Sequence, residues 1–206
     1  MEALTVSRLD WAAAAAPSPA DPEDSGDRYL VVPHSRGALV VVADGVGHGP
    51  EAAAAAQLAI EVAGRSAHGS PLALLRECHQ ALRATRGAVV SVASFDDAER
   101  TMTWAGVGNV EGVLLRADPR AAPRQESLLL RGGVVGRELP PLAALLLGVE
   151  AGDTLVFATD GVRPEFAADL NAQVPPQRLA DLILTRYQKG SDDALVLVAR
   201  VRGDGA

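Results

Sequence analysis

Four aspartates in this chain stand at the ends of apolar segments, where carboxylates could together hold a metal ion. Asp44 and Asp160 each follow such a segment, whereas Asp27 and Asp192 precede one. A lone aspartate in this position is usually a turn residue or a helix cap. Four of them would meet at one edge if their strands are neighbours, and their charges would then repel unless a cation joins them. Ligand sets made only of oxygen favour Mg²⁺ or Mn²⁺ over structural zinc.

The surroundings of Asp44 are the most informative stretch of the sequence. Residues 38–43 form an apolar, β-branched run of the length expected for a buried strand. The turn that follows contains three glycines, Gly45, Gly47 and Gly49. Pro50 and Glu51 then indicate the start of a helix over residues 50–65, because proline and an acid are favoured in the first turn. The pattern therefore predicts a carboxylate presented at a sheet edge, above a helix start.

The remaining pattern of apolar residues predicts alternating blocks of strands and helices. We expect further strands over residues 3–10, 28–33, 88–95, 101–105, 109–115, 128–130, 154–158 and 194–201. Further helices are expected over residues 71–84 and 175–188, and a loop over residues 11–26. Strand blocks interleaved with separate helices indicate an α+β domain with antiparallel sheets covered by helices. The length of 206 residues fits one domain, residues 1–206.

Composition excludes several classes of protein. The formal net charge of −7 argues against a broad surface for nucleic acid or anionic membranes. No apolar run approaches the ~20 residues of a membrane span, and the start of the chain lacks the pattern of a signal peptide. The single cysteine, Cys78, excludes an intramolecular disulfide and favours a reducing compartment. We therefore expect a soluble, cytoplasmic protein with neither nucleic acid nor membrane as a partner.

Several short motifs give the chain a family resemblance. They are Ser-Gly-Asp at 25–27, Ala-Asp-Gly-Val-Gly-His-Gly at 43–49, Ala-Thr-Asp-Gly at 158–161 and Asp-Asp-Ala-Leu-Val at 192–196. Their order and spacing resemble the PPM-type metal-dependent protein serine/threonine phosphatases, and more closely the SpoIIE-like branch and its stressosome phosphatases. The segment 104–109 is also similar to the glycine-asparagine motif of that branch. Each motif alone is weak, but the ordered set covers residues 27–201.

The resemblance implies a β-sandwich of two antiparallel sheets flanked by helices, with a site for two Mn²⁺ or Mg²⁺ ions at one end. By motif, Asp44 would bridge both ions, and the carbonyl of Gly45 would ligate the second. Asp160 and Asp192 would bind the first ion. Asp27 would belong to the site directly or through water.

The resemblance also implies a reaction. A metal-bridged hydroxide would attack phosphoserine or phosphothreonine in line, with Asp44, Asp160 and Asp192 as the catalytic set. Three further residues are expected to support these ligands, namely Asp193, Asn109 and His48.

The chain departs from the pattern of eukaryotic relatives at two places. Val46 stands where those relatives carry a histidine that is a candidate general acid, and His48 lies two residues further on. Those relatives also carry an N-terminal arginine that grips phosphate. Arg8 and Arg28 are the nearest candidates here, but neither lies in a motif that fixes it, so exposed structural charge is the favoured interpretation of both.

The implied partner is a phosphorylated STAS-domain signalling protein, either a stressosome scaffold or an anti-sigma antagonist. The segment that large relatives insert before the second Asp-Gly motif is short here, so docking of a folded partner would select the substrate. Two alternatives remain: a non-catalytic phosphoprotein-binding module with a phosphatase fold, and a different two-metal hydrolase for small phosphoesters. The intact carboxylate motifs count against the first, and the lack of a GxxxxGK[ST] loop leaves the second without support.

Overall fold

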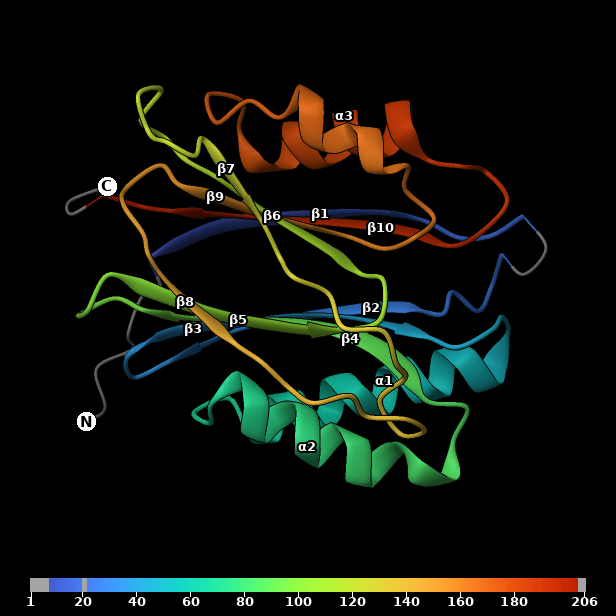
Figure 1. Ribbon diagram of the computed structural model, residues 1–206. Helices are drawn as coiled ribbons and strands as arrows, with labels where there is room; N and C mark the ends of the chain where they lie inside the picture. Colours follow the sequence, from blue (N-terminus) through green and yellow to red (C-terminus); the bar gives the residue numbers. More distant parts are fainter. Residues whose placement is uncertain (1–7, 20–21, 204–206) are drawn as a thin grey trace, which may run out of the picture.

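Two five-stranded antiparallel sheets stack face to face in the computed structural model, which describes residues 8–19 and 22–203 (Figure 1). The first sheet has the order β1 (Leu9–Ala16), β10 (Ala194–Val201), β9 (Thr154–Ala158), β6 (Glu111–Leu115) and β7 (Gln125–Ser127). The second has the order β2 (Asp27–His34), β3 (Gly37–Gly45), β4 (Ala88–Asp96), β5 (Thr101–Val107) and β8 (Leu145–Gly148). The predicted α+β fold, a sandwich of antiparallel sheets, is confirmed.

Helices cover the outer face of each sheet (Figure 1). Two of them, α1 (Pro50–Arg65) and α2 (Pro71–Ala81), lie against the second sheet, and a short 3₁₀ turn, η1 (Leu82–Ala84), continues α2. The first sheet is covered by α3 (Pro176–Tyr187), which follows the 3₁₀ segment η2 (Pro164–Asp169). The side that α1 buries consists of alanines, whose small side chains let the helix approach the sheet closely. Within the described ranges, no helix is long and apolar enough to cross a membrane.

Strand β3 is buried on both faces, which explains its continuous apolar run. Val40 and Val42 point into the core between the sheets, where Trp104 and Phe157 also lie. The alternate residue Val41 packs instead into the layer between the second sheet and its helices. Asp44 and Gly45 are the last two residues of β3 and therefore lie at one end of the sandwich.

The N-terminal strand differs from its prediction. We expected a strand over residues 3–10 and a loop from residue 11, but β1 spans Leu9–Ala16 and pairs with β10 along its whole length. Residues 3–7 of the expected strand lie outside the described part of the chain. Alanine has low strand propensity, yet a neighbouring strand and partial burial override propensity here.

Two edge strands also differ from prediction. We placed a strand over residues 128–130, but β7 covers Gln125–Ser127. Strand β8 was not predicted at all. Each pairs with one neighbour only, β7 with β6 and β8 with β5. An edge strand is specified largely by its backbone pairing, which leaves little trace in an apolar pattern.

Candidate metal-dependent active site

The conspicuous aspartates meet at one end of the sandwich, supplied by both sheets. Asp27 and Asp44 lie opposite each other across β2 and β3. The backbone of Gly45 continues this contact, because its N–H donates to the carbonyl of Gly26 over 3.0 Å. In the other sheet, β9 runs into Asp160, while Asp192 stands two residues before β10. Aspartates of the two sheets, 116 or more positions apart in sequence, thus converge on one site.

An open pocket of about 410 Å³ lies between these strand ends. Its lining includes three carboxylates, those of Asp44, Asp160 and Asp192, together with Asn109 and His48. None of the described residues that line the pocket is a lysine or an arginine. The pocket therefore concentrates negative charge without a side-chain cation, which is the electrostatic setting of a cation site.

Asp44 carries the strongest electrostatic signature in the pocket. Burial, together with the smaller effect of the neighbouring charges of Asp27, Asp160, Asp192 and Asp193, raises the pKa of its carboxyl to about 9. Each of these causes disfavours the ionised form. A bound cation would reverse the balance by stabilising the carboxylate, so the position of Asp44 suits a metal ligand better than an unpaired acid.

Asp27 lies beneath the pocket and does not line it. Only 5% of the residue is exposed, and its Oδ2 accepts a 2.7 Å hydrogen bond from the hydroxyl of Thr159. Burial raises the pKa of Asp27 to about 7, although the hydrogen bond from Thr159 opposes that rise. Thr159 directly precedes Asp160 in the Ala-Thr-Asp-Gly motif, but we predicted no role for it from the sequence. Thr159 links Asp27 of one sheet to the other sheet.

Asp192 and Asp193 have different environments although they are neighbours in sequence. Asp193 is 6% exposed and accepts hydrogen bonds of 2.7 Å from the backbone N–H groups of Ser18 and Gly26. Asp192 instead lines the pocket, and its Oδ1 accepts the backbone N–H of Asp193 over 2.9 Å. The structure thus gives Asp193 an anchoring contact with the chain that precedes Asp27, and leaves Asp192 facing the pocket.

Asn109 and His48 both line the pocket but have different contacts. The Nδ2 of Asn109 donates a 2.8 Å hydrogen bond to Oδ2 of Asp160 and so fixes the direction of that carboxylate. His48 is exposed on the glycine-rich turn after β3, as is Val46. Asn109 therefore contacts a candidate ligand directly, whereas His48 lies at the rim.

Both Asp-Gly pairs need glycine because backbone segments pack tightly there. A Cβ atom at Gly45 would lie 2.0 Å from the carbonyl oxygen of Ala52 in the first turn of α1. A Cβ atom at Gly161 would lie 1.8 Å from the carbonyl oxygen of Asp193. Neither contact can relax by rotating a side chain. The two glycines thus hold the strand ends that carry Asp44 and Asp160 against their neighbours.

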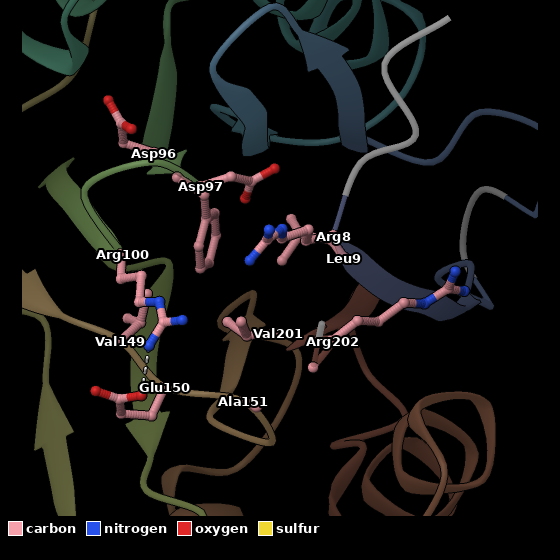
Figure 2. Close-up of a pocket in the computed structure, with 12 residues that line it drawn as sticks. Arg8, Leu9, Asp96, Asp97, Arg100, Val149, Glu150, Ala151, Val201 and Arg202 are labelled. Atoms are coloured by element: carbon pink, nitrogen blue, oxygen red, sulfur yellow. Dashed lines mark ion pairs between the residues drawn. The ribbon is translucent and has the colours of Figure 1, made fainter. Parts of the chain in front are cut away.

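The two arginines considered as phosphate ligands lie elsewhere or are already engaged. Arg28 donates from Nη1 to the carbonyls of Ser25 and Asp27, over 2.6 and 2.8 Å. Arg8 lines a small hollow of about 80 Å³ with Asp97 and Glu150 (Figure 2). That hollow adjoins Asp96, which pairs with Gly37 at the start of β3, whereas Asp44 lies near the other end of the strand, roughly 23 Å away at about 3.3 Å per residue. Arg8 is therefore at the wrong end of the sandwich to grip phosphate.

The carboxylates fit a hydrated ion better than a fully enclosed one. In the described part of the chain, no three or more Asp, Glu, His or Cys side chains form a ready-made metal cluster. Magnesium binds commonly through one or two carboxylates and keeps several waters, and the open pocket has room for them. The donor set of oxygens, the absence of a cation in the lining and the raised pKa of Asp44 all fit Mg²⁺ or Mn²⁺.

Comparison with known proteins gives one family and many related folds. The family model described as "Stage II sporulation protein E (SpoIIE)" matches residues 34–202. A search of the curated proteins finds no match. One solved structure, reported under the words "The bacterial stressosome: a modular system that has been adapted to control secondary messenger signaling", is 29% identical with a TM-score of 0.83. The similarity covers 93% of this chain and 99% of that one.

Two further structures share the fold at lower identity. RsbX in complex with magnesium is 20% identical with a TM-score of 0.81, covering 94% of this chain and 95% of that chain. The catalytic domain of the serine/threonine protein phosphatase PstP, in complex with two manganese ions, is 20% identical with a TM-score of 0.67. This similarity covers 95% of this chain and 99% of the PstP chain. At this identity, both likenesses establish the fold.

Proposed function

The chain belongs to the SpoIIE family and is a PPM-type phosphatase, and from that premise we propose that it hydrolyses phosphoserine or phosphothreonine on a bacterial signalling protein. The observation that carries the proposal is the convergence of Asp44, Asp160 and Asp192 from two sheets around one open pocket. A phosphoryl group on a folded protein needs such an open site, because a deep pocket would exclude it.

Two Mn²⁺ or Mg²⁺ ions are the proposed cofactors. Asp44 and the carbonyl of Gly45 would hold them from the second sheet, and Asp160 and Asp192 from the first. The ions would supply a water of lowered pKa as nucleophile and would neutralise the phosphoryl oxygens. The magnesium in RsbX and the two manganese ions in PstP, which share this fold, support the choice of metal.

The protein's own residues would orient these ligands. Asn109 holds Oδ2 of Asp160, so the other oxygen is left to face an ion. Thr159 holds Oδ2 of the buried Asp27, beneath the pocket. A phosphate dianion alone would be repelled by the pocket carboxylates, so we expect binding of substrate to require bound metal.

The proposed substrate is a phosphorylated STAS-domain protein of a stressosome, either its scaffold or an anti-sigma antagonist. The similarity to the 29% identical protein reported from the bacterial stressosome supports this choice, as does the match to RsbX over nearly the whole chain. Such a partner would place the protein in the cytoplasm.

The experiment is a phosphate-release assay with a phosphorylated STAS-domain protein, run with Mn²⁺, with Mg²⁺ and with EDTA. An Asp44→Asn variant serves as the matched comparison, because it keeps the size of the side chain and removes the charge. We expect release by the wild type with either metal, none with EDTA, and a loss of at least about a hundredfold in the variant.

Each other result points to a different conclusion. No release by the wild type under any divalent metal would indicate a non-catalytic, phosphoprotein-binding module. Equal release by wild type and variant would refute the metal assignment. Turnover of a small aryl phosphate without turnover of any phosphoprotein would indicate a hydrolase for small phosphoesters.

A further inference from the structure

We propose that a second hollow beside the active site binds an acidic side chain of the substrate protein, an inference that rests on the proposed phosphoprotein phosphatase function. The hollow has a volume of about 350 Å³ and is separate from the carboxylate pocket. We call it the arginine hollow and define it by its lining residues, Glu51, Ala54, Ala84, Thr85, Arg86 and Arg137.

The arginine hollow and the carboxylate pocket share the glycine-rich turn after β3. Gly47, in this turn, lines the carboxylate pocket. It also lies close to Arg86, because a Cβ atom added at Gly47 would be 2.8 Å from Nη1 of Arg86. The turn is tied to the same segment, because the N–H of Val46 donates to the carbonyl of Gly87 over 3.0 Å. A substrate that extends from the carboxylate pocket across this turn would therefore reach Arg86.

The two arginines are held in place while keeping donors for a ligand. Nε of Arg86 pairs with Oε2 of Glu51 at 2.5 Å, and Nε of Arg137 donates to the carbonyl of Arg86 over 3.3 Å. Among the described residues, the Nη groups of both arginines donate no hydrogen bond. The side chain of Arg86 is 42% exposed. A guanidinium that is fixed through Nε and open at Nη presents a fork that matches a carboxylate.

The position of the hollow favours a side chain next to the phosphorylated residue over the phosphoryl group itself. Neither Arg86 nor Arg137 lines the carboxylate pocket, where the phosphoryl group would be held. An extended chain advances about 3.3 Å per residue, so a residue a few positions from the phosphorylated one would reach across the turn. Aspartate or glutamate at that position would meet the free Nη groups.

The test uses phosphopeptides in which one glutamate is moved along the sequence a position at a time, each matched by a peptide with glutamine there. Binding is measured by fluorescence anisotropy, and hydrolysis is measured as kcat/KM with Mn²⁺. Wild type is compared with Arg86→Ala, Arg86→Lys and Arg137→Ala. Arg76→Ala is the charge-matched control, because Arg76 is exposed on α2 and does not line the arginine hollow.

We expect one glutamate position at which wild type prefers glutamate over glutamine by about three- to tenfold, the size of a charge-assisted pair at a partly exposed site. Arg86→Ala should abolish this preference, Arg137→Ala should reduce it, Arg86→Lys should keep part of it, and Arg76→Ala should leave it unchanged.

Three results would overturn the proposal. Wild type could show no preference for glutamate at any position, or the preference could persist in Arg86→Ala. Arg86→Ala could also bind and hydrolyse the glutamate and glutamine peptides of each pair more weakly by the same factor. A preference in binding that depends on Arg86, without phosphate release from any peptide or from the phosphorylated STAS-domain protein, would instead support the arginine hollow and refute the phosphatase function. Binding and hydrolysis together therefore separate the two proposals.

Discussion

The hydroxyl of Thr159 donates to Oδ2 of Asp27 over 2.7 Å and thereby joins the two sheets beneath the candidate active site. The same hydroxyl oxygen accepts the backbone N–H of Leu195 over 2.9 Å. Three separate strands therefore meet at one buried side chain, at the end of the sandwich where the acids collect. The hydroxyl couples the position of an acidic residue of the site to the packing of the fold.

Replacing Thr159 by valine should destabilise the protein while keeping its shape. Valine has nearly the same volume, but it leaves the carboxylate of Asp27 and the N–H of Leu195 without this partner. Each buried group left unsatisfied costs about 1–3 kcal/mol, which urea denaturation would detect. Thr159→Ser retains the hydroxyl and should lie close to wild type. If Thr159→Ser lost as much stability as Thr159→Val, the effect would come from packing and not from the hydroxyl.

The metal-free protein should lose stability as the pH rises. An aspartate in an unfolded chain has a pKa of about 3.9, whereas burial and like charges raise the pKa of Asp44 to about 9 and that of Asp27 to about 7. Between these values the folded state holds protons that the unfolded state releases, so the free energy of unfolding falls from about pH 4 to about pH 9. Urea denaturation in EDTA across this range measures the slope. Asp44→Asn should flatten it, and an unchanged slope would contradict the prediction.

Bound metal should reverse this trend at alkaline pH. At a free Mn²⁺ concentration a hundred times its dissociation constant, binding adds about 2.7 kcal/mol of stability. For a chain of this length, that should raise the Tm by roughly 5–10 °C. Differential scanning calorimetry at pH 8, with Mn²⁺ and with EDTA, provides the measurement. The shift should be smaller at pH 5, because protons compete for the carboxylates, and absent in Asp44→Asn. An equal shift in that variant would place the ion elsewhere.

Elements with a strong local pattern could be predicted from the sequence. Contacts between distant parts of the chain could not. Strand β3 and helix α1 were predicted because a β-branched run and a proline-acid helix start leave clear local signals. Strand β1 was misplaced because its alanines become a strand only by pairing with β10 at the other end of the chain. For the same reason, the bond between Thr159 and Asp27 could not be predicted: it joins residues 132 positions apart.

The neighbouring acids Asp192 and Asp193 should respond differently to the same substitution. Asp193 accepts two backbone N–H groups, from Ser18 and Gly26, so Asp193→Asn keeps only one acceptor oxygen and should cost about 1–3 kcal/mol of stability.

Asp192 lines the pocket, so Asp192→Asn should leave the stability of the metal-free protein nearly unchanged or slightly higher, since it removes one of several repelling charges. Its effect should lie in metal affinity, which we expect to fall at least about tenfold. Urea denaturation in EDTA gives the first quantity, and calorimetric titration with Mn²⁺ gives the second. Asp193→Asn should keep most of its metal affinity wherever it is folded, because its side chain binds backbone and does not line the pocket. A larger loss of metal affinity in Asp193→Asn than in Asp192→Asn would indicate that Asp193, and not Asp192, binds the metal.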